Sequence, residues 1–115
     1  MSGRQCGCVL ILAIGLAGFS PRAVWADSPP TIAVTIKDHR FDPAEIHVPQ
    51  GKRVMLHITN ADSTPEEFDS SALQVEKVIP GGAYGTVWLR PLGPGRYPFM
   101  GEFHPETAKG VVISE

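Results

Sequence analysis

Short runs of alternating apolar and polar residues, separated by glycine and proline, constrain the fold of this chain more than any other feature. The stretches 31–36 and 54–59 place an apolar residue at every second position. Side chains two residues apart lie on the same face of a strand, so each run predicts a strand with one buried face. The breakers PQGK (49–52) and PLGPG (91–95) separate such runs. This pattern favours an all-β sandwich.

The alternation predicts where the strands lie. We expect them over residues 31–36, 45–48, 54–59, 84–89, 96–100 and 111–114. Residues 38–43 are expected to form a loop whose apolar side chain, Phe41, packs against the core. Phe68 is expected to be the next core residue after the loop over residues 60–65. Residues 70–77 suit either a short strand or a turn of helix.

The N-terminus has the pattern of a secretory signal peptide. Arg4 precedes an apolar run over residues 8–19, and AVWA (23–26) offers small residues to a signal peptidase. The run is shorter than the roughly 20 residues that span a bilayer. We therefore expect a signal peptide over residues 1–26 and a single periplasmic domain over 27–115, with no transmembrane segment of its own after cleavage. The alternative is a buried N-terminal helix or an uncleaved anchor.

Cleavage would change both the cysteine content and the charge of the protein. Cys6 and Cys8 lie in the signal peptide, so the exported domain has no disulfide and no thiolate ligand. Removal of Arg4 and Arg22 leaves 8 basic residues against 12 acidic ones, a net charge of −4. No basic cluster is present, so we expect no nucleic-acid partner.

Two long segments resemble the cupredoxin family. They are FDPAEIHVPQGKRVMLHITNAD (41–62) and PLGPGRYPFMGEFH (91–104), which carry the patterns F-x-P-x-x-I-x-V-x-x-G and P-G-x-Y-x-F. The resemblance covers residues 32–113, nearly the whole expected domain. It implies a cupredoxin-like Greek-key β-sandwich and a metal site at one end.

The ligand positions depart from those of blue copper proteins in the same family. Gly101 stands at the position of the family's cysteine, and Glu66 stands at the position of its first histidine. His104 alone matches a family ligand, and no methionine follows it before Gly110. Blue copper requires the cysteine sulfur. A blue copper centre is therefore excluded.

The remaining candidate ligands are mostly carboxylates. In a sandwich of this kind the loops over residues 60–68 and 101–109 meet at one end, which would bring Glu66 and Glu67 near Glu102 and His104. Carboxylates with one or two imidazoles suit iron, manganese, zinc or cupric copper. Glu66 is preferred to Glu67, because it shares strand parity with Phe68 and a half-buried carboxylate needs a partner.

Other candidate residues have plainer explanations. Glu76 is either near the ligands without contacting the metal or paired at the surface with Lys77 or Arg90. Met100 is expected to fill the core rather than bind copper. The remaining histidines, His39, His47 and His57, are expected at the surface.

The strings EEF (66–68), EK (76–77) and GEFH (101–104) resemble a subgroup of periplasmic cupredoxin-like proteins that accompany bacterial iron permeases. This resemblance implies an iron or copper ion as cofactor and an inner-membrane iron permease as partner. Three functions stay open: metal binding in support of iron acquisition, a ferroxidase step in ferrous iron uptake, and a metal-free interaction module. Whether the protein is an enzyme is left open by the sequence.

Overall fold

The computed structural model describes residues 3, 15, 18 and 28–115. The expected signal peptide over residues 1–26 lies outside the described residues, apart from three glycines, and its cleavage stays a prediction. Residues 28–115 form nine strands and contain no helix. Accordingly, no helix within this described range is long and apolar enough to cross a membrane.

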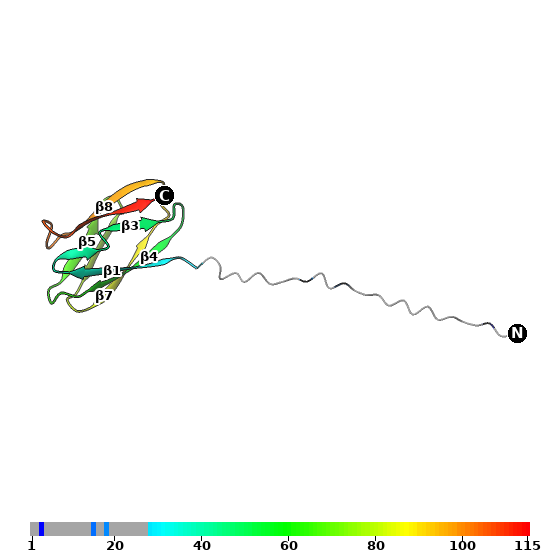
Figure 1. The fold of residues 1–115 in the computed structure, drawn as a ribbon, viewed down its shortest axis with the longest axis horizontal. Helices are drawn as coiled ribbons and strands as arrows, with labels where there is room; N and C mark the ends of the chain where they lie inside the picture. The colour runs from blue at the N-terminus through cyan, green and yellow to red at the C-terminus, as the bar shows by residue number, and fades with distance from the viewer. Residues whose placement is uncertain (1–2, 4–14, 16–17, 19–27) are drawn as a thin grey trace.

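The nine strands form two sheets that face each other, as the ribbon in Figure 1 shows. In chain order the strands are β1 (Thr31–Lys37), β2 (Arg40–Asp42), β3 (Glu45–Val48), β4 (Val54–Asn60), β5 (Glu66–Ser70), β6 (Val75–Ile79), β7 (Tyr84–Leu89), β8 (Gly95–Gly101) and β9 (Lys109–Ser114). The first sheet has the order β2-β1-β4-β7, and the second has the order β3-β9-β8-β5-β6. The expected all-β sandwich is confirmed.

Strand direction gathers three loops at one end of the sandwich. β1 runs parallel to β4, and β8 runs antiparallel to both β5 and β9. The β1–β2, β4–β5 and β8–β9 connections consequently lie at the same end. In Figure 1 the β8–β9 connection extends from the end opposite the C-terminus. These connections position the candidate site.

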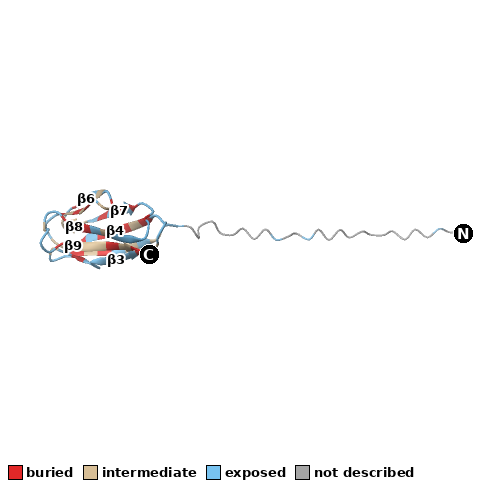
Figure 2. Cartoon of the chain, turned by 90° about the horizontal axis from the view of Figure 1, so that it is seen from above, coloured by how far each residue is buried: buried red, intermediate tan, exposed pale blue. Residues whose placement is uncertain are grey.

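The core lies between the sheets, and buried residues alternate with exposed ones along the strands, as Figure 2 shows. Three aromatic rings occupy the part of the core nearest the candidate site. Phe41 meets Phe68 and Phe99 edge-on, with centroid distances of 5.8 and 5.0 Å, and Phe68 stacks on Phe99 at 4.8 Å. Such pairs stabilise a core by about 0.5–1.5 kcal/mol beyond their buried area.

Two segments differ from the sequence-based expectation. The segment expected as a loop over residues 38–43 contains the short strand β2, because Phe41 is buried and pairs with Ile36 of β1. The ambiguous segment 70–77 is a turn over residues 71–74 followed by β6. Leu73 is buried in that turn and not in a strand.

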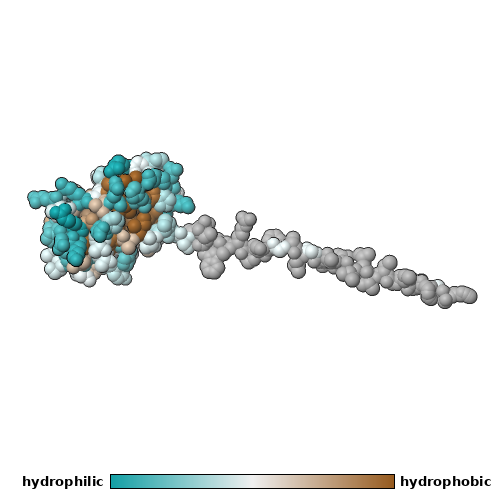
Figure 3. Space-filling model, viewed as in Figure 1, coloured by the Kyte–Doolittle hydropathy of each residue, from teal (hydrophilic) through white to brown (hydrophobic). Residues whose placement is uncertain are grey.

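The outer face of β4 and β7 carries exposed aromatic residues. Trp88 is 43% exposed and Tyr84 is 66% exposed. The Arg53 guanidinium lies 4.0 Å from the Trp88 ring centroid, and His57 stacks on Tyr84 at 4.7 Å. Hydrophilic side chains cover much of the molecular face in Figure 3, with a hydrophobic area between them.

Candidate metal centre

Asn60 fixes the loop that leads into the candidate site. It is the last residue of β4 and is fully buried. Its amide group donates to the carbonyl oxygens of Thr64 at 2.9 Å and Ile79 at 3.1 Å, and its side-chain oxygen accepts from the Asp62 N–H at 3.0 Å. These three bonds hold the β4–β5 loop in place, so that Glu66 begins β5 facing the interior.

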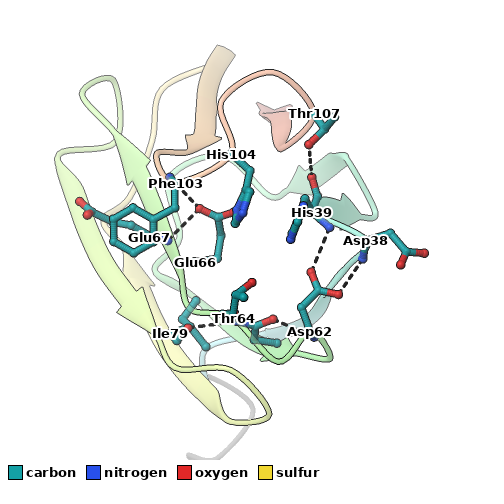
Figure 4. A network of polar contacts seen from close by, with 11 residues as sticks. Asp38, His39, Asp62, Thr64, Glu66, Glu67, Ile79, Phe103, His104 and Thr107 are labelled. Carbon is teal, nitrogen blue, oxygen red and sulfur yellow. Dashed lines mark hydrogen bonds and ion pairs between the residues drawn. The ribbon is translucent and has the colours of Figure 1, made fainter.

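Glu66 is a buried carboxylate with a complete set of partners. It is 1% exposed and shares its inward face with Phe68. Its Oε1 accepts from the backbone N–H groups of Glu67 and Phe103, each at 3.0 Å, and its Oε2 lies 2.5 Å from His104 Nδ1. Figure 4 shows this network. Such bonds are what a buried charge requires, because transfer out of water is otherwise costly.

Glu66 determines which nitrogen of His104 can bind a metal. An ionised carboxylate only accepts hydrogen bonds, so Nδ1 of a neutral His104 carries the proton and Nε2 offers its lone pair. A histidine that binds a metal is commonly oriented by a carboxylate in this way. The His104 side chain is 26% exposed, so Nε2 is not sealed in the core.

Gly101 leaves room for the Glu66 carboxylate. A Cβ atom at position 101 would lie 2.6 Å from Glu66 Cδ, 2.8 Å from its Oε1 and 2.6 Å from Ala108 Cβ. These separations are too short for atoms that are not bonded to each other. The carboxylate therefore occupies the space that a side chain at position 101 would need, and a cysteine there would be incompatible with Glu66 as placed.

His39 lies beside His104, contrary to the expectation of a surface histidine. The two rings stack with a centroid distance of 3.5 Å and an interplanar angle of 9°. His39 is half-buried in the β1–β2 connection. Both rings line a pocket of about 340 Å³ whose other walls are Phe103, Pro105, Glu106 and Thr107. The sequence pattern did not predict His39 as part of the site, because its contact with His104 arises from packing between loops that are distant in the sequence.

Asp62 holds the backbone of the His39 loop. Its carboxylate accepts from the N–H groups of Asp38 at 2.8 Å and His39 at 2.9 Å. The bonds to His39 and Asp38 lower the pKa of Asp62 from its ordinary value. On the other side of the loop, the Thr107 hydroxyl donates to the His39 carbonyl oxygen at 2.7 Å.

The other expected ligands lie on the outer face of the second sheet. Side-chain oxygens of Glu67, Asp69 and Glu76 all lie within 4.8 Å of one another. Partial burial, then a hydrogen bond with Glu102 and repulsion from neighbouring carboxylates, raises the pKa of Glu67. Arg90 does not pair with Glu76 but donates to the carbonyl oxygens of residues 72 and 73.

The structure therefore divides the expected ligand set, which was predicted as one site. Glu66 faces the interior and contacts His104, whereas Glu67 belongs with Glu76 to the outer group, because successive residues of β5 point to opposite faces. Glu102 joins this face through its backbone N–H, which donates to the Glu67 carbonyl oxygen at 3.0 Å. The His104 imidazole fits an ion that accepts nitrogen ligands, and it does not by itself fit blue copper, which needs a sulfur ligand. Whether any of these residues binds metal stays a prediction.

The remaining histidines and Met100 lie away from the inner pair. His47 is exposed on β3, with Nδ1 2.8 Å from Glu115 and Nε2 3.6 Å from Glu45. His57 lies on the outer face of the first sheet, stacked on Tyr84. Met100 is half-buried on β8 opposite Asp69 of β5.

The sequence is similar to a known family of domains and to a protein from another organism. Residues 8–114 match the family model of the cupredoxin-like domain. An uncharacterised protein of Rickettsia prowazekii (strain Madrid E) is 43% identical over 82 residues, which cover 71% of this chain and 66% of the relative's own length.

Solved structures share the fold at lower identity. The metal-binding domain of the Cu(I)-exporting P-type ATPase CopA of Streptococcus pneumoniae, with Cu(I), superposes with a TM-score of 0.66 and 16% identity, covering 74% of this chain and 84% of that one. A Cu(I) form of an amicyanin mutant gives a TM-score of 0.61 and 21% identity, with coverage of 74% and 82%.

Proposed function

The chain belongs to the cupredoxin-like family, and on this premise we propose that it binds a transition-metal ion through His104. One observation carries the proposal. Nδ1 of His104 is held by the buried Glu66 carboxylate, which leaves Nε2 with a lone pair beside a pocket of about 340 Å³. An imidazole whose Nδ1 is held by a carboxylate and whose Nε2 lone pair is available is suited to bind copper, iron, zinc or nickel.

Copper and iron are the proposed ions. The structural neighbours named above contain Cu(I), and their likeness to this chain supports the fold alone. No cysteine lies within residues 28–115, so this part of the chain lacks the thiolate that favours soft Cu(I), and an oxygen- and nitrogen-binding ion such as cupric copper or iron suits the centre better.

We assign the domain to iron acquisition in the periplasm, next to an inner-membrane iron permease. The support is the resemblance of the strings EEF, EK and GEFH to proteins that accompany such permeases. The periplasmic location follows from the expected signal peptide over residues 1–26. A ferroxidase step in iron uptake is the enzymatic alternative.

The outer group of carboxylates is a second candidate site. Oxygens of Glu67, Asp69 and Glu76 converge within 4.8 Å, and the Glu102 backbone N–H donates to the Glu67 carbonyl oxygen at 3.0 Å. Carboxylate oxygens suit hard ions such as Mn(II) and Fe(II). Binding of iron there and of a redox-active ion at His104 would favour the ferroxidase alternative over simple iron binding.

Two substitutions test the role of His104. His104→Ala removes the ligand. Glu66→Gln keeps the shape and one oxygen for the backbone N–H groups, but its amide donates to Nδ1 and moves the imidazole proton to Nε2. Calorimetric titration with Cu(II), Fe(II), Mn(II) and Zn(II) should show that each variant loses at least about tenfold in affinity for the preferred ion. The control His47→Ala should keep the wild-type affinity.

The double variant separates orientation from direct binding. If Glu66 acts through His104, then Glu66→Gln adds nothing once His104 is alanine. If the wild type binds no ion more tightly than about 1 mM, near −4 kcal/mol, the metal-binding proposal fails and the metal-free interaction module replaces it.

A further inference from the structure

We propose that the protein forms a symmetric dimer in which the free edge of β7 pairs, antiparallel, with β7 of a second copy. The pairing would join two four-stranded sheets into one continuous sheet of eight strands. It involves an edge of the first sheet that the proposed metal centre does not use, so it does not depend on metal binding at His104.

The first support is the free edge itself. β7 ends the order β2-β1-β4-β7, and no strand in the described part of the chain pairs with its far side. In Figure 1, β7 lies at the margin of the sandwich. An edge strand presents a row of backbone N–H and C=O groups that can pair with another chain.

The ladder with β4 shows which backbone groups lie on this free side. The Asn60 N–H donates to the Ala83 carbonyl oxygen at 2.8 Å, and the same register continues along β4 and β7. Hydrogen-bonded pairs alternate with non-hydrogen-bonded pairs in an antiparallel ladder. The backbone groups of Tyr84, Thr86 and Trp88 therefore point away from β4, toward the open edge.

The second support is the composition of this edge. Proteins protect free edges from association with charged side chains, proline or short length. The described sandwich has four edge strands, and β2 (RFD), β3 (EIHV) and β6 (VEKVI) each carry charged residues. β7 (YGTVWL) is the longest of the four at six residues, and it alone among them has no charged residue. Its β-branched and aromatic residues favour strand pairing.

The third support is that the β7 sequence is self-complementary about Thr86. An antiparallel pair that places Thr86 opposite the partner's Thr86 also places Tyr84 opposite the partner's Trp88, and symmetry repeats this aromatic contact. All three residues lie on the exposed outer face of the strand, where Tyr84 is 66% and Trp88 43% exposed. Aromatic pairs and Thr–Thr pairs across strands are favourable. This register also matches the three residues whose backbone groups point to the edge.

The inner face of the strand limits the strength of the contact. The same register places Gly85, which has no side chain, opposite the partner's Val87. A Cβ atom at position 85 would lie 3.4 and 3.9 Å from two side-chain carbons of Lys77, so this lysine runs beside the edge. Its counterpart in the second copy would carry the same charge near the two-fold axis. We therefore expect a weak dimer that forms as the concentration rises.

The geometry also limits the assembly to two copies. A two-fold contact uses the same surface on both subunits and is closed. Once the two β7 strands pair, the joined sheet ends in a β2 strand on each side. β2 has three residues, two of them charged, so it is a poor template for further pairing.

The first test measures association of the full chain, without added metal, by analytical ultracentrifugation from about 1 μM to 1 mM. Wild type should dimerise over this range. Thr86→Lys places two like charges opposite each other in the dimer and should lower the association constant at least about tenfold. Thr59→Lys adds the same charge at an exposed residue of β4, one strand away from the edge, and should stay within about twofold. Thermal unfolding should show that both variants are folded.

A second test fixes the position of the two-fold axis. Hydrogen-bonded residues in an antiparallel pair have Cα atoms about 5.5 Å apart, which a disulfide can span. Under mild oxidation, Thr86→Cys in a Cys6→Ser, Cys8→Ser background should form a covalent dimer. Thr59→Cys in the same background is the control and should stay monomeric in denaturing electrophoresis without reductant.

A third test examines the register. In the proposed pairing both aromatic contacts contain one Tyr84 and one Trp88, so either Tyr84→Ala or Trp88→Ala removes both. The double variant should then be little weaker in association than the more affected single variant. Additive losses would mean that the two rings do not face each other, and would overturn the register.

The remaining outcomes decide the dimer itself. A wild type that stays monomeric up to about 1 mM would overturn it. Equal effects of Thr86→Lys and Thr59→Lys, or equal crosslinking of the two cysteine variants, would mean that any association uses another surface, and assembly beyond two copies would contradict the closed pair. None of these results bears on metal binding, since His104→Ala should leave association unchanged.

Discussion

At the inner end of the candidate site, the Glu66 side chain packs directly against the backbone of Gly101. The carboxylate of Glu66 fills the space that a Cβ at position 101 would occupy. One of its oxygens accepts hydrogen bonds from two backbone N–H groups, and the other contacts His104. A side chain at position 101 and the Glu66 carboxylate therefore compete for the same space.

This linkage predicts that Gly101→Ala destabilises the protein. The added Cβ would lie 2.6 Å from both Glu66 Cδ and Ala108 Cβ, and overpacking of a buried site costs about 1–3 kcal/mol. Urea denaturation of wild type, Gly101→Ala, Glu66→Ala and the double variant measures the coupling. In the Glu66→Ala background the cost should fall, with an interaction energy of about 0.5–3 kcal/mol. Simple additivity would contradict the steric account.

The sequence predicted part of this site. Strand parity with Phe68 placed Glu66 inside, and the structure agrees. The same parity puts Glu67 on the opposite face of β5, apart from Glu66 and His104, and the role of each residue in metal binding stays a prediction. His39 could not be found, because its position depends on the bonds from Asp62 and Thr107, and neither residue is near it in the sequence.

At the scale of elements, alternation predicted the long strands well and the short ones poorly. β1, β4 and β7 have alternating burial over six or seven residues. β2 has three residues and one buried side chain, which is too little to form a periodic pattern. β6 is an edge strand of the second sheet, and Ile79 is its only buried residue, so its burial does not alternate.

The end of β4 should depend on Asn60. Its three side-chain hydrogen bonds are the link between the β4–β5 loop and β6. Asn60→Ala leaves buried or half-buried backbone groups without partners, and we expect a loss of about 1–3 kcal/mol in the free energy of unfolding. Chemical denaturation measures this loss. Ser63→Ala, an exposed change in the same loop, should stay within about 0.5 kcal/mol; equal effects would show that the loop does not rely on Asn60.

The contact between β3 and the C-terminal residue should be pH-dependent. The Glu115 carboxylate, hydrogen-bonded to His47, raises the pKa of His47 from its ordinary value, with smaller help from Glu45. A raised folded-state pKa gives stability that is fully present below the unfolded pKa, about 6.5, and is lost as pH rises through the folded pKa.

Nuclear magnetic resonance titration of the His47 ring tests this directly. Glu115→Gln should lower the His47 pKa, and it should destabilise the protein more at about pH 5.5 than at about pH 8. The His57 ring, which has no carboxylate among its described contacts, serves as the internal reference. An unchanged His47 pKa in Glu115→Gln would show that the C-terminal contact does not form in solution.

At the scale of the whole molecule, the second sheet separates two chemical environments. Its inner face carries a buried carboxylate paired with imidazole, and its outer face carries a group of carboxylates that repel one another. The hydrophobic residues of β5 and β8, including Phe68 and Phe99, lie on the inner side. The two groups share the strand β5 but face away from each other, so binding at one should be largely independent of binding at the other.

This separation yields a prediction with opposite outcomes at the two sites. Glu76→Gln with Glu102→Gln removes two charges from the outer group and should weaken Mn(II) or Fe(II) binding there, since hard ions depend on anionic oxygen ligands. The same variant should keep Cu(II) binding at His104 within about twofold, because the altered residues lie on the other face of the sheet. His104→Ala should do the reverse. Calorimetric titration of both proteins with Mn(II) and Cu(II) compares them directly. If one substitution weakens both ions equally, the two faces contribute to a single site through rearrangement of β5, and the division seen in the structure does not describe the metal-bound protein.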